Sequence, residues 1–130
     1  MALMESSEMY LETIYILSKS RETVHAVDVC EYMHFSKPSV SNAVKHLKEG
    51  GYITVDKDRH IFLTDEGRKV AEEMYSRHTV LTRCLESLGV SSETAEKDAC
   101  LIEHDLSTES FEAIKRAVER HGKEPFLMTE

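Results

Sequence analysis

The stretch SKPSVSNAVKHLKEGGYITVDKDRHIFLT, residues 36–64, changes character at its glycine pair. Before the glycines, Ser36 is a good N-cap, and Pro38 is tolerated because the first turn of a helix has no partner for the missing N–H. Glycines also suit the left-handed C-cap that ends a helix. After them, β-branched and aromatic residues flank the charged turn DKDR, a pattern typical of a β-hairpin. The stretch therefore predicts a helix over 36–49 and a hairpin over 52–64.

Two shorter helical patterns precede this stretch. Residues 7–18 repeat apolar side chains at helical spacing, and residues 25–33 fit a short helix followed by the tight turn HFS. The predicted order is that of a winged helix-turn-helix: helix, short helix, turn, helix and hairpin. In such a domain the helix after the turn lies in the major groove of DNA. Other small α+β domains also contain two helices and a hairpin, and winged helices also serve as protein-binding modules.

Small polar residues favour DNA over protein as the partner of this domain. A helix built only for packing would not carry so many short hydrogen-bonding groups in its first two turns. In the helix over 36–49 these groups belong to Ser36, Ser39, Ser41 and Asn42. In the hairpin, Lys57 and Arg59 are expected to face phosphates.

The composition fits one ordinary globular domain or two small ones that share a core: 130 residues, 41% of them hydrophobic. There is no run of about 18 apolar residues, and Glu5, Glu8 and Glu12 occupy the segment where a signal peptide needs a basic start and an apolar centre. We therefore expect a cytoplasmic protein without a membrane partner. The cysteines are odd in number and not closely paired, so we expect reduced thiols at Cys30, Cys84 and Cys100.

The net charge of −8 argues at first against a nucleic-acid partner, but the distribution of charge matters more than the sum. Acidic residues concentrate in the C-terminal half, whereas the helix over 36–49 carries Lys37, Lys45 and Lys48. An acidic protein with one basic helix would bind DNA weakly. We expect a bound cation or dimerisation to improve its fit.

The second half of the chain is helical by pattern. A long helix starts after Thr64 and stops at Gly89, a second is capped at Ser91 or Ser92 and runs through residue 106, and a third covers 107–122, closed by Gly122. Residues 123–130 look like a tail. The predicted fold is mostly α with a small β-hairpin: an N-terminal winged helix-turn-helix over 1–65, then a helical domain over 66–130.

Three donor groups stand close together in EKDACLIEH, residues 96–104. Cys100, Glu103 and His104 are spaced i, i+3, i+4, which puts them on one face of a helix. The spacing permits chelation, although it is also the commonest spacing of residues that merely share a helix face. A mixed set of sulfur, nitrogen and oxygen donors suits a borderline divalent transition ion better than Ca(II) or Mg(II).

Other potential ligands recur outside this cluster. Met9 and Glu12 share a face of the first helix, and His78 lies within the long helix. Each also has an ordinary interpretation: a core methionine, a solvated glutamate and a hydrogen-bonded, partly buried histidine.

Two other classes of function can be built on the same residues. A thiol-dependent enzyme would use Cys100 as nucleophile and His104 as base, but both lie on one helix without an evident Gly-rich turn, oxyanion donor or orienting residue. A winged-helix regulator without a metal would sense oxidation through Cys100. Such a regulator would bind DNA in the presence of a metal chelator, and it would lose DNA binding in the presence of peroxide.

Taken together, SEMYLETIY, SKPSVSNAVKHLKEGGYI, LTDEGRKVAEEMYSRH and DACLIEHDLS resemble the diphtheria toxin repressor and manganese transport regulator family of metal-dependent repressors. The resemblance runs from about residue 6 to 122, in the same order. It implies a homodimer whose winged domains bind palindromic operator DNA when Fe(II) or Mn(II) is present, and neither an enzyme nor a receptor for a small-molecule substrate. We expect no third, SH3-like domain, as in the two-domain manganese type.

The resemblance implies a hybrid metal site. The primary site of the iron-responsive branch is matched by Met9, Cys100, Glu103 and His104, whereas Glu12 and His78 match the binuclear site of the manganese branch. Thr82 and Glu96 depart from the ancillary site of the iron branch. We expect Fe(II) or Mn(II), one or two ions per subunit, with the soft donors favouring Fe(II).

The resemblance also implies which surfaces meet DNA and the partner subunit. Ser36, Pro38 and Asn42 correspond to base-facing positions, and Lys37, Ser39 and Ser41 to phosphate contacts, with Lys45 on the same basic helix. The expected dimer surface, which could instead be intramolecular core, consists of Leu101, Ile102, Leu106, Phe111, Ile114 and Val118.

Overall fold

The computed structural model describes residues 5–121 and divides into two compact units, Met1–Glu73 and Met74–Glu130. Within the described residues it contains six helices and one antiparallel hairpin, so the predicted fold class is confirmed. The elements in chain order are α1 (Glu5–Ser20), α2 (Ala26–Met33), α3 (Lys37–Glu49), β1 (Ile53–Val55), β2 (Ile61–Leu63), α4 (Asp65–Ser87), α5 (Ser92–Ile102) and α6 (Thr108–His121). Helix α4 begins in the first unit and continues into the second. A domain boundary at residue 65 stays a prediction.

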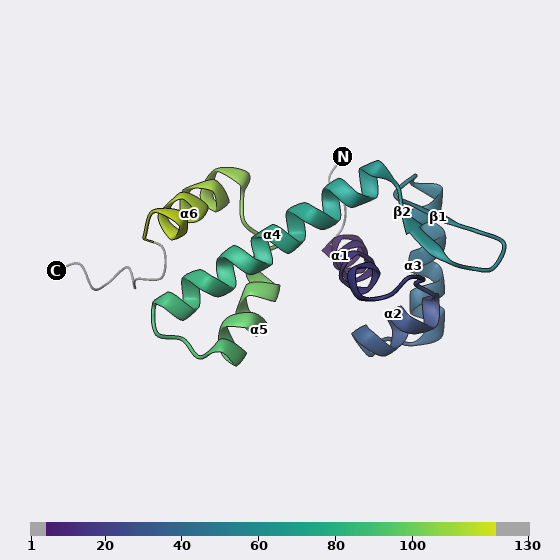
Figure 1. Cartoon of the computed structure of the whole chain (residues 1–130), viewed down its shortest axis with the longest axis horizontal. Helices are drawn as coiled ribbons and strands as arrows, with labels where there is room; N and C mark the ends of the chain where they lie inside the picture. Colours follow the sequence, from purple (N-terminus) through teal and green to yellow (C-terminus); the bar gives the residue numbers. More distant parts are fainter. Residues whose placement is uncertain (1–4, 122–130) are drawn as a thin grey trace. The chain divides into compact units, whose positions relative to one another are not determined.

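The first unit contains α1, α2, α3, the hairpin and the start of α4 (Figure 1). One apolar core joins them, and Ala71 is the residue of α4 that is buried in it. The predicted helical spacing is borne out in α1, and α3 likewise buries apolar residues on one face. Leu11 and Ile14 on α1 are 0% and 1% exposed, and Val40 and Leu47 on α3 are 0% and 2% exposed. Ile53 and Ile61 bring the hairpin into the same core.

Helix α3 begins and ends as its sequence predicts. The hydroxyl of Ser36 accepts a hydrogen bond from the backbone N–H of Ser39 at 3.3 Å, which satisfies one of the free donors of the first turn. The helix ends at Glu49, and Gly51 follows with φ of +84°, a backbone conformation that favours glycine.

The hairpin is closed by one aspartate. Oδ1 of Asp56 accepts hydrogen bonds from the backbone N–H groups of Asp58 (2.9 Å) and His60 (2.8 Å), and these bonds, led by the one from His60, lower the pKa of Asp56. Arg59 has φ of +66°, within the turn. The N–H of Ile61 donates to the carbonyl of Val24 at 2.8 Å, which attaches the hairpin to the segment before α2.

A glycine fixes the start of α4 against the first strand. Gly67 is buried, and a Cβ added to it would lie 2.0 Å from the carbonyl oxygen of Tyr52. The same carbonyl accepts a hydrogen bond from the N–H of Thr64 at 3.1 Å. The hydroxyl of Thr64 in turn donates to the carbonyl of Gly51 at 2.7 Å.

The second unit consists of the rest of α4 with α5 and α6 (Figure 1). Leu81, Ala95, Ala99, Phe111 and Val118 are at most 4% exposed. The predicted helix through residue 106 was too long: α5 ends at Ile102, and the next hydrogen bond, from the N–H of Asp105 to the carbonyl of Ile102, closes a tighter turn. The predicted end of the last helix at Gly122 and the tail over 123–130 lie outside the described residues. No helix within 5–121 has the length and apolar character needed to cross a membrane.

Candidate functional site

The exposed face of α3 carries the residues predicted to contact DNA. Val40 and Leu47 hold the opposite face in the core, so the polar residues of the first turns face solvent. Lys57 and Arg59 in the hairpin are exposed as well. All the predicted contacts of the α3 segment are exposed: Ser36, Lys37, Pro38, Ser39, Ser41, Asn42 and Lys45. Their contacts with DNA stay a prediction.

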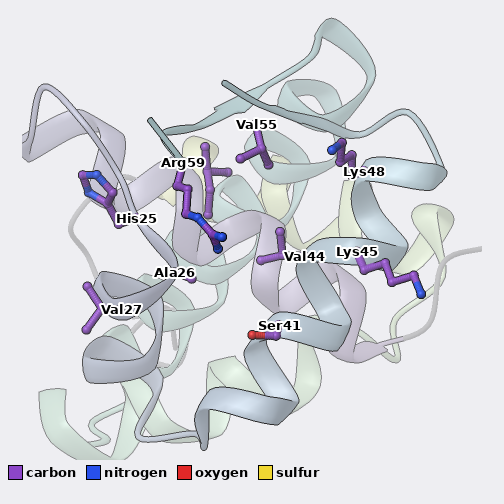
Figure 2. A pocket seen from close by; sticks show the side chains of 10 residues that line it. His25, Ala26, Val27, Ser41, Val44, Lys45, Lys48, Val55 and Arg59 are labelled. Atoms are coloured by element: carbon purple, nitrogen blue, oxygen red, sulfur yellow. The ribbon is translucent and has the colours of Figure 1, made fainter. Parts of the chain in front are cut away.

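A groove of about 410 Å³ lies between α3, the start of α2 and the hairpin. Its lining includes the cations Lys45, Lys48 and Arg59 and no carboxylate, although the chain as a whole has a net charge of −8. Figure 2 shows Arg59 on the hairpin side of the groove and Lys45 and Lys48 on α3. A groove with this lining can attract phosphate groups.

Two polar groove residues, His25 and Lys48, were not among the predicted DNA contacts. Lys48 was recognised only as part of the basic helix, and its place in the groove that Arg59 also lines depends on how the hairpin folds back. His25 is the N-cap of α2, and its ring lies 4.7 Å from that of His60, measured between centroids. No sequence pattern indicates that contact. Lys57 does not line the groove.

Three metal-ligand candidates of the second unit meet at one buried carboxylate. Glu103, which follows the last residue of α5, is 0% exposed. Its Oε1 lies 2.9 Å from Nδ1 of His78 on α4, and its Oε2 lies 3.5 Å from Nε2 of His104. The side chain of His104 is 1% exposed. Glu103, His78 and His104 are called the buried donor cluster below.

The buried donor cluster has the character of a metal site. A buried carboxylate is costly unless it is paired and hydrogen-bonded, yet within the described residues Oε2 of Glu103 has no hydrogen-bond partner. One carboxylate with two imidazoles is a donor set that divalent Mn, Fe, Co or Zn accepts. The residues present therefore fit a divalent transition ion.

The hydrogen bond from Glu103 raises the pKa of His78, against the opposing effect of partial burial. The charges of Glu103 and, more weakly, Glu96 act in the same direction. In the absence of a metal the imidazolium form of His78 is thus favoured. A metal ligand must be neutral, so an ion would have to displace this proton.

Cys100 does not join the buried donor cluster. It is exposed on α5, and within the described residues its sulfur forms no close donor group with Glu103 and His104. Glu103 keeps a helical backbone conformation and its N–H donates to the carbonyl of Ala99, so exposure, rather than helical spacing, separates Cys100 from the buried Glu103. Met9 is half-buried and Glu12 is buried, both on α1 in the first unit. Ligand roles for Cys100, Met9 and Glu12 stay predictions.

The expected dimer surface divides into exposed and buried members. Leu101 and Ile102 are 66% and 36% exposed, so they can meet a partner. Phe111 and Val118 are 2% and 3% exposed within the single chain and belong to its core. Leu106 and Ile114 are half-buried.

Two family models match the chain along most of its length. Residues 2–61 match the N-terminal DNA-binding domain of iron-dependent repressors, and residues 64–126 match the metal-binding and dimerisation domain of the same proteins.

Named relatives and solved structures agree with these matches. The transcriptional regulator MntR of Escherichia coli O6:H1 is 35% identical over 113 residues, which cover 87% of this chain and 73% of MntR. The iron-dependent repressor IdeR of Mycobacterium tuberculosis is 30% identical over 125 residues, which cover 95% of this chain and 54% of IdeR. A structure of the manganese regulator SloR superposes with a TM-score of 0.78 at 28% identity, covering 87% of this chain and 53% of that one. The chain thus spans about half of the length of IdeR and of the SloR chain.

Proposed function

The chain belongs to the iron-dependent repressor family of metal-dependent transcriptional regulators, and we propose that it binds palindromic operator DNA as a homodimer when Fe(II) or Mn(II) is bound. The observation that carries the proposal is the buried donor cluster, in which a solvent-excluded carboxylate faces two imidazoles. The exposed polar face of α3, beside a groove lined by cations, would bind the DNA.

Glu103, His104 and His78 would hold the ion in the second unit. From the resemblance, Met9 and Glu12 on α1 and Cys100 on α5 would complete the ligand set, with one or two ions per subunit. When bound, the ion supplies a link among these donors. Since α1 belongs to the unit that carries α3, a ligand set drawn from both units would couple metal binding to the DNA-binding unit. Couplings of this kind typically amount to about 1–3 kcal/mol, or roughly 5- to 150-fold in affinity.

The donors of this chain bear on the choice of metal. The carboxylates and imidazoles suit Mn(II), Fe(II) and Zn(II) alike, whereas the thioether of Met9 and the thiolate of Cys100 are soft and favour Fe(II) over Mn(II). We therefore propose Fe(II) as the better activator, with Mn(II) as the alternative.

The residues of α3 would read the operator. Ser36, Pro38 and Asn42 would face base edges, with Pro38 in apolar contact with thymine methyl groups. Lys37, Ser39, Ser41 and Lys45 would contact phosphates, together with Lys57 and Arg59 from the hairpin. A two-fold dimer requires a palindrome, because each recognition helix meets one half-site. Leu101 and Ile102, exposed at the end of α5, would contribute to the contact between subunits.

An anaerobic selection of genomic DNA fragments by the purified protein tests this function. The selection is run in parallel with Fe(II), with Mn(II) and with chelator. Palindromic fragments enriched only with a metal support the proposal, and the stronger enrichment identifies the activating ion. Equal enrichment in chelator would leave a regulator without metal control, such as one that senses oxidation at Cys100. No enrichment in any arm would refute DNA binding.

A further inference from the structure

An arginine is buried next to the donor cluster without being a metal ligand. Arg77 precedes His78 on α4 and is 6% exposed. A buried guanidinium is costly unless its donors find acceptors. The groups that accept hydrogen bonds from Arg77 therefore show which part of the chain Arg77 holds in place.

Arg77 donates to the backbone just beyond α5. Its Nη1 donates to the carbonyl of Glu103 at 3.0 Å and to the carbonyl of Leu106 at 2.7 Å. The last carbonyls of a helix have no partner within the helix, and a cation near them also interacts favourably with the helix dipole. These two contacts span the turn that contains His104.

The guanidinium also contacts the next helix. It lies 5.2 Å from the centre of the Phe111 ring, a cation–π contact with α6. Phe111 is 2% exposed, so neither group is free to move far. One side chain of α4 is thereby fixed to the end of α5 and to α6.

We propose that Arg77 is a positioning residue of the metal site, which holds Glu103 and His104 in their ligating arrangement before the ion binds. The argument is geometric. Glu103 is the residue whose backbone carbonyl binds Arg77 and whose carboxylate faces His78, the neighbour of Arg77 on α4. Arg77 and His78 therefore hold both ends of Glu103. Some residues hold a metal ligand in place without binding the metal themselves. Removing such a residue typically weakens metal affinity by about 10- to 100-fold.

This inference rests on the proposed metal site, and Arg77→Met tests it. The full-length protein is titrated with Co(II) and with Mn(II), and the Co(II) absorption spectrum is recorded. We expect the metal Kd of Arg77→Met to rise by about 10-fold or more and the Co(II) spectrum to change, because the ligands lose their arrangement. In the metal-free protein, the backbone amides of Glu103 and Asp105 should exchange with deuterium faster than in the wild type.

Two further variants keep the test decisive. Arg77→Lys retains the charge but not the planar fork, so its metal affinity should lie between those of the wild type and Arg77→Met. Arg83→Met removes an exposed arginine of the same helix and should leave affinity and spectrum unchanged. Wild-type affinity and spectrum in Arg77→Met would overturn the inference, even if its melting temperature falls; if that variant does not fold, the same result in Arg77→Lys would overturn it. A wild-type protein that binds no metal would refute the proposed function itself.

Discussion

Nδ1 of His78 lies 2.9 Å from Oε1 of Glu103, although 25 positions of sequence separate the two residues. The contact joins α4 to the end of α5, and it is made by a carboxylate that solvent does not reach. It favours the protonated imidazole in the metal-free protein.

This contact predicts how the stability of the metal-free protein depends on pH. The pKa of His78 is raised in the folded state above its ordinary value of 6.5. The contribution of the contact to stability is therefore complete below about pH 6.5 and is lost as the pH rises through the folded-state pKa. Urea unfolding in chelator between pH 6 and 9 should show this loss in the wild type.

The loss should be smaller in His78→Gln, which cannot titrate. His46→Gln, on the exposed side of α3, serves as the control and should behave as the wild type. Identical pH profiles for His78→Gln and the wild type would show that the contact does not control stability.

Gly67→Ala should destabilise the first unit. The new Cβ would lie 2.0 Å from the carbonyl oxygen of Tyr52, so the start of α4 or the strand must move. Overpacking of this kind costs about 1–3 kcal/mol. Urea unfolding measures the change, and Glu66→Ala at the neighbouring exposed position should change stability little. A Gly67→Ala protein as stable as the wild type would contradict the packing described for this junction.

Ser36→Ala should weaken the start of α3. The hydroxyl that accepts from the N–H of Ser39 is lost, and removal of such a cap typically costs about 1 kcal/mol. Ser41→Ala, on the exposed face of the same helix, is the matched control, because Ser41 is not the N-cap. An equal loss of stability in both variants would argue against the cap.

The fold of the first unit could be predicted from local signals. The cap at Ser36, the glycines after Glu49 and the change from helical to alternating pattern are all encoded within a few residues of the elements that they define. They gave both ends of α3 and the hairpin correctly. The contact between the His25 and His60 rings depends on how the hairpin folds back, and no local pattern encodes it.

The metal site shows the opposite case. Spacing alone predicted that Cys100, Glu103 and His104 share a helix face. The helix ends at Ile102, one residue before Glu103, which still has a helical backbone conformation. Arg77, 26 positions away from Glu103, donates to the backbone carbonyl of Glu103. Glu103 is fully buried and Cys100 is exposed. A helix end that a distant side chain stabilises cannot be located from the sequence around it.

Cys100→Ser tests whether the exposed thiol is a ligand. If it binds the metal as a thiolate, Co(II) should give the wild type an intense charge-transfer absorption that the variant lacks. Cys84→Ser is the control, because burial raises the pKa of the Cys84 thiol and opposes formation of its thiolate. The same absorption in wild type and Cys100→Ser would remove Cys100 from the ligand set.

The most direct test of metal control is the operator affinity of Glu103→Ala, measured by fluorescence anisotropy with Fe(II), with Mn(II) and with chelator under anaerobic conditions. For the wild type we expect the metal to raise affinity by roughly 5- to 150-fold. For Glu103→Ala we expect the same weak affinity in all three conditions, with the dimer and helical content retained as checked by sedimentation and circular dichroism. A metal response of wild-type size in a folded, dimeric Glu103→Ala protein would contradict the account.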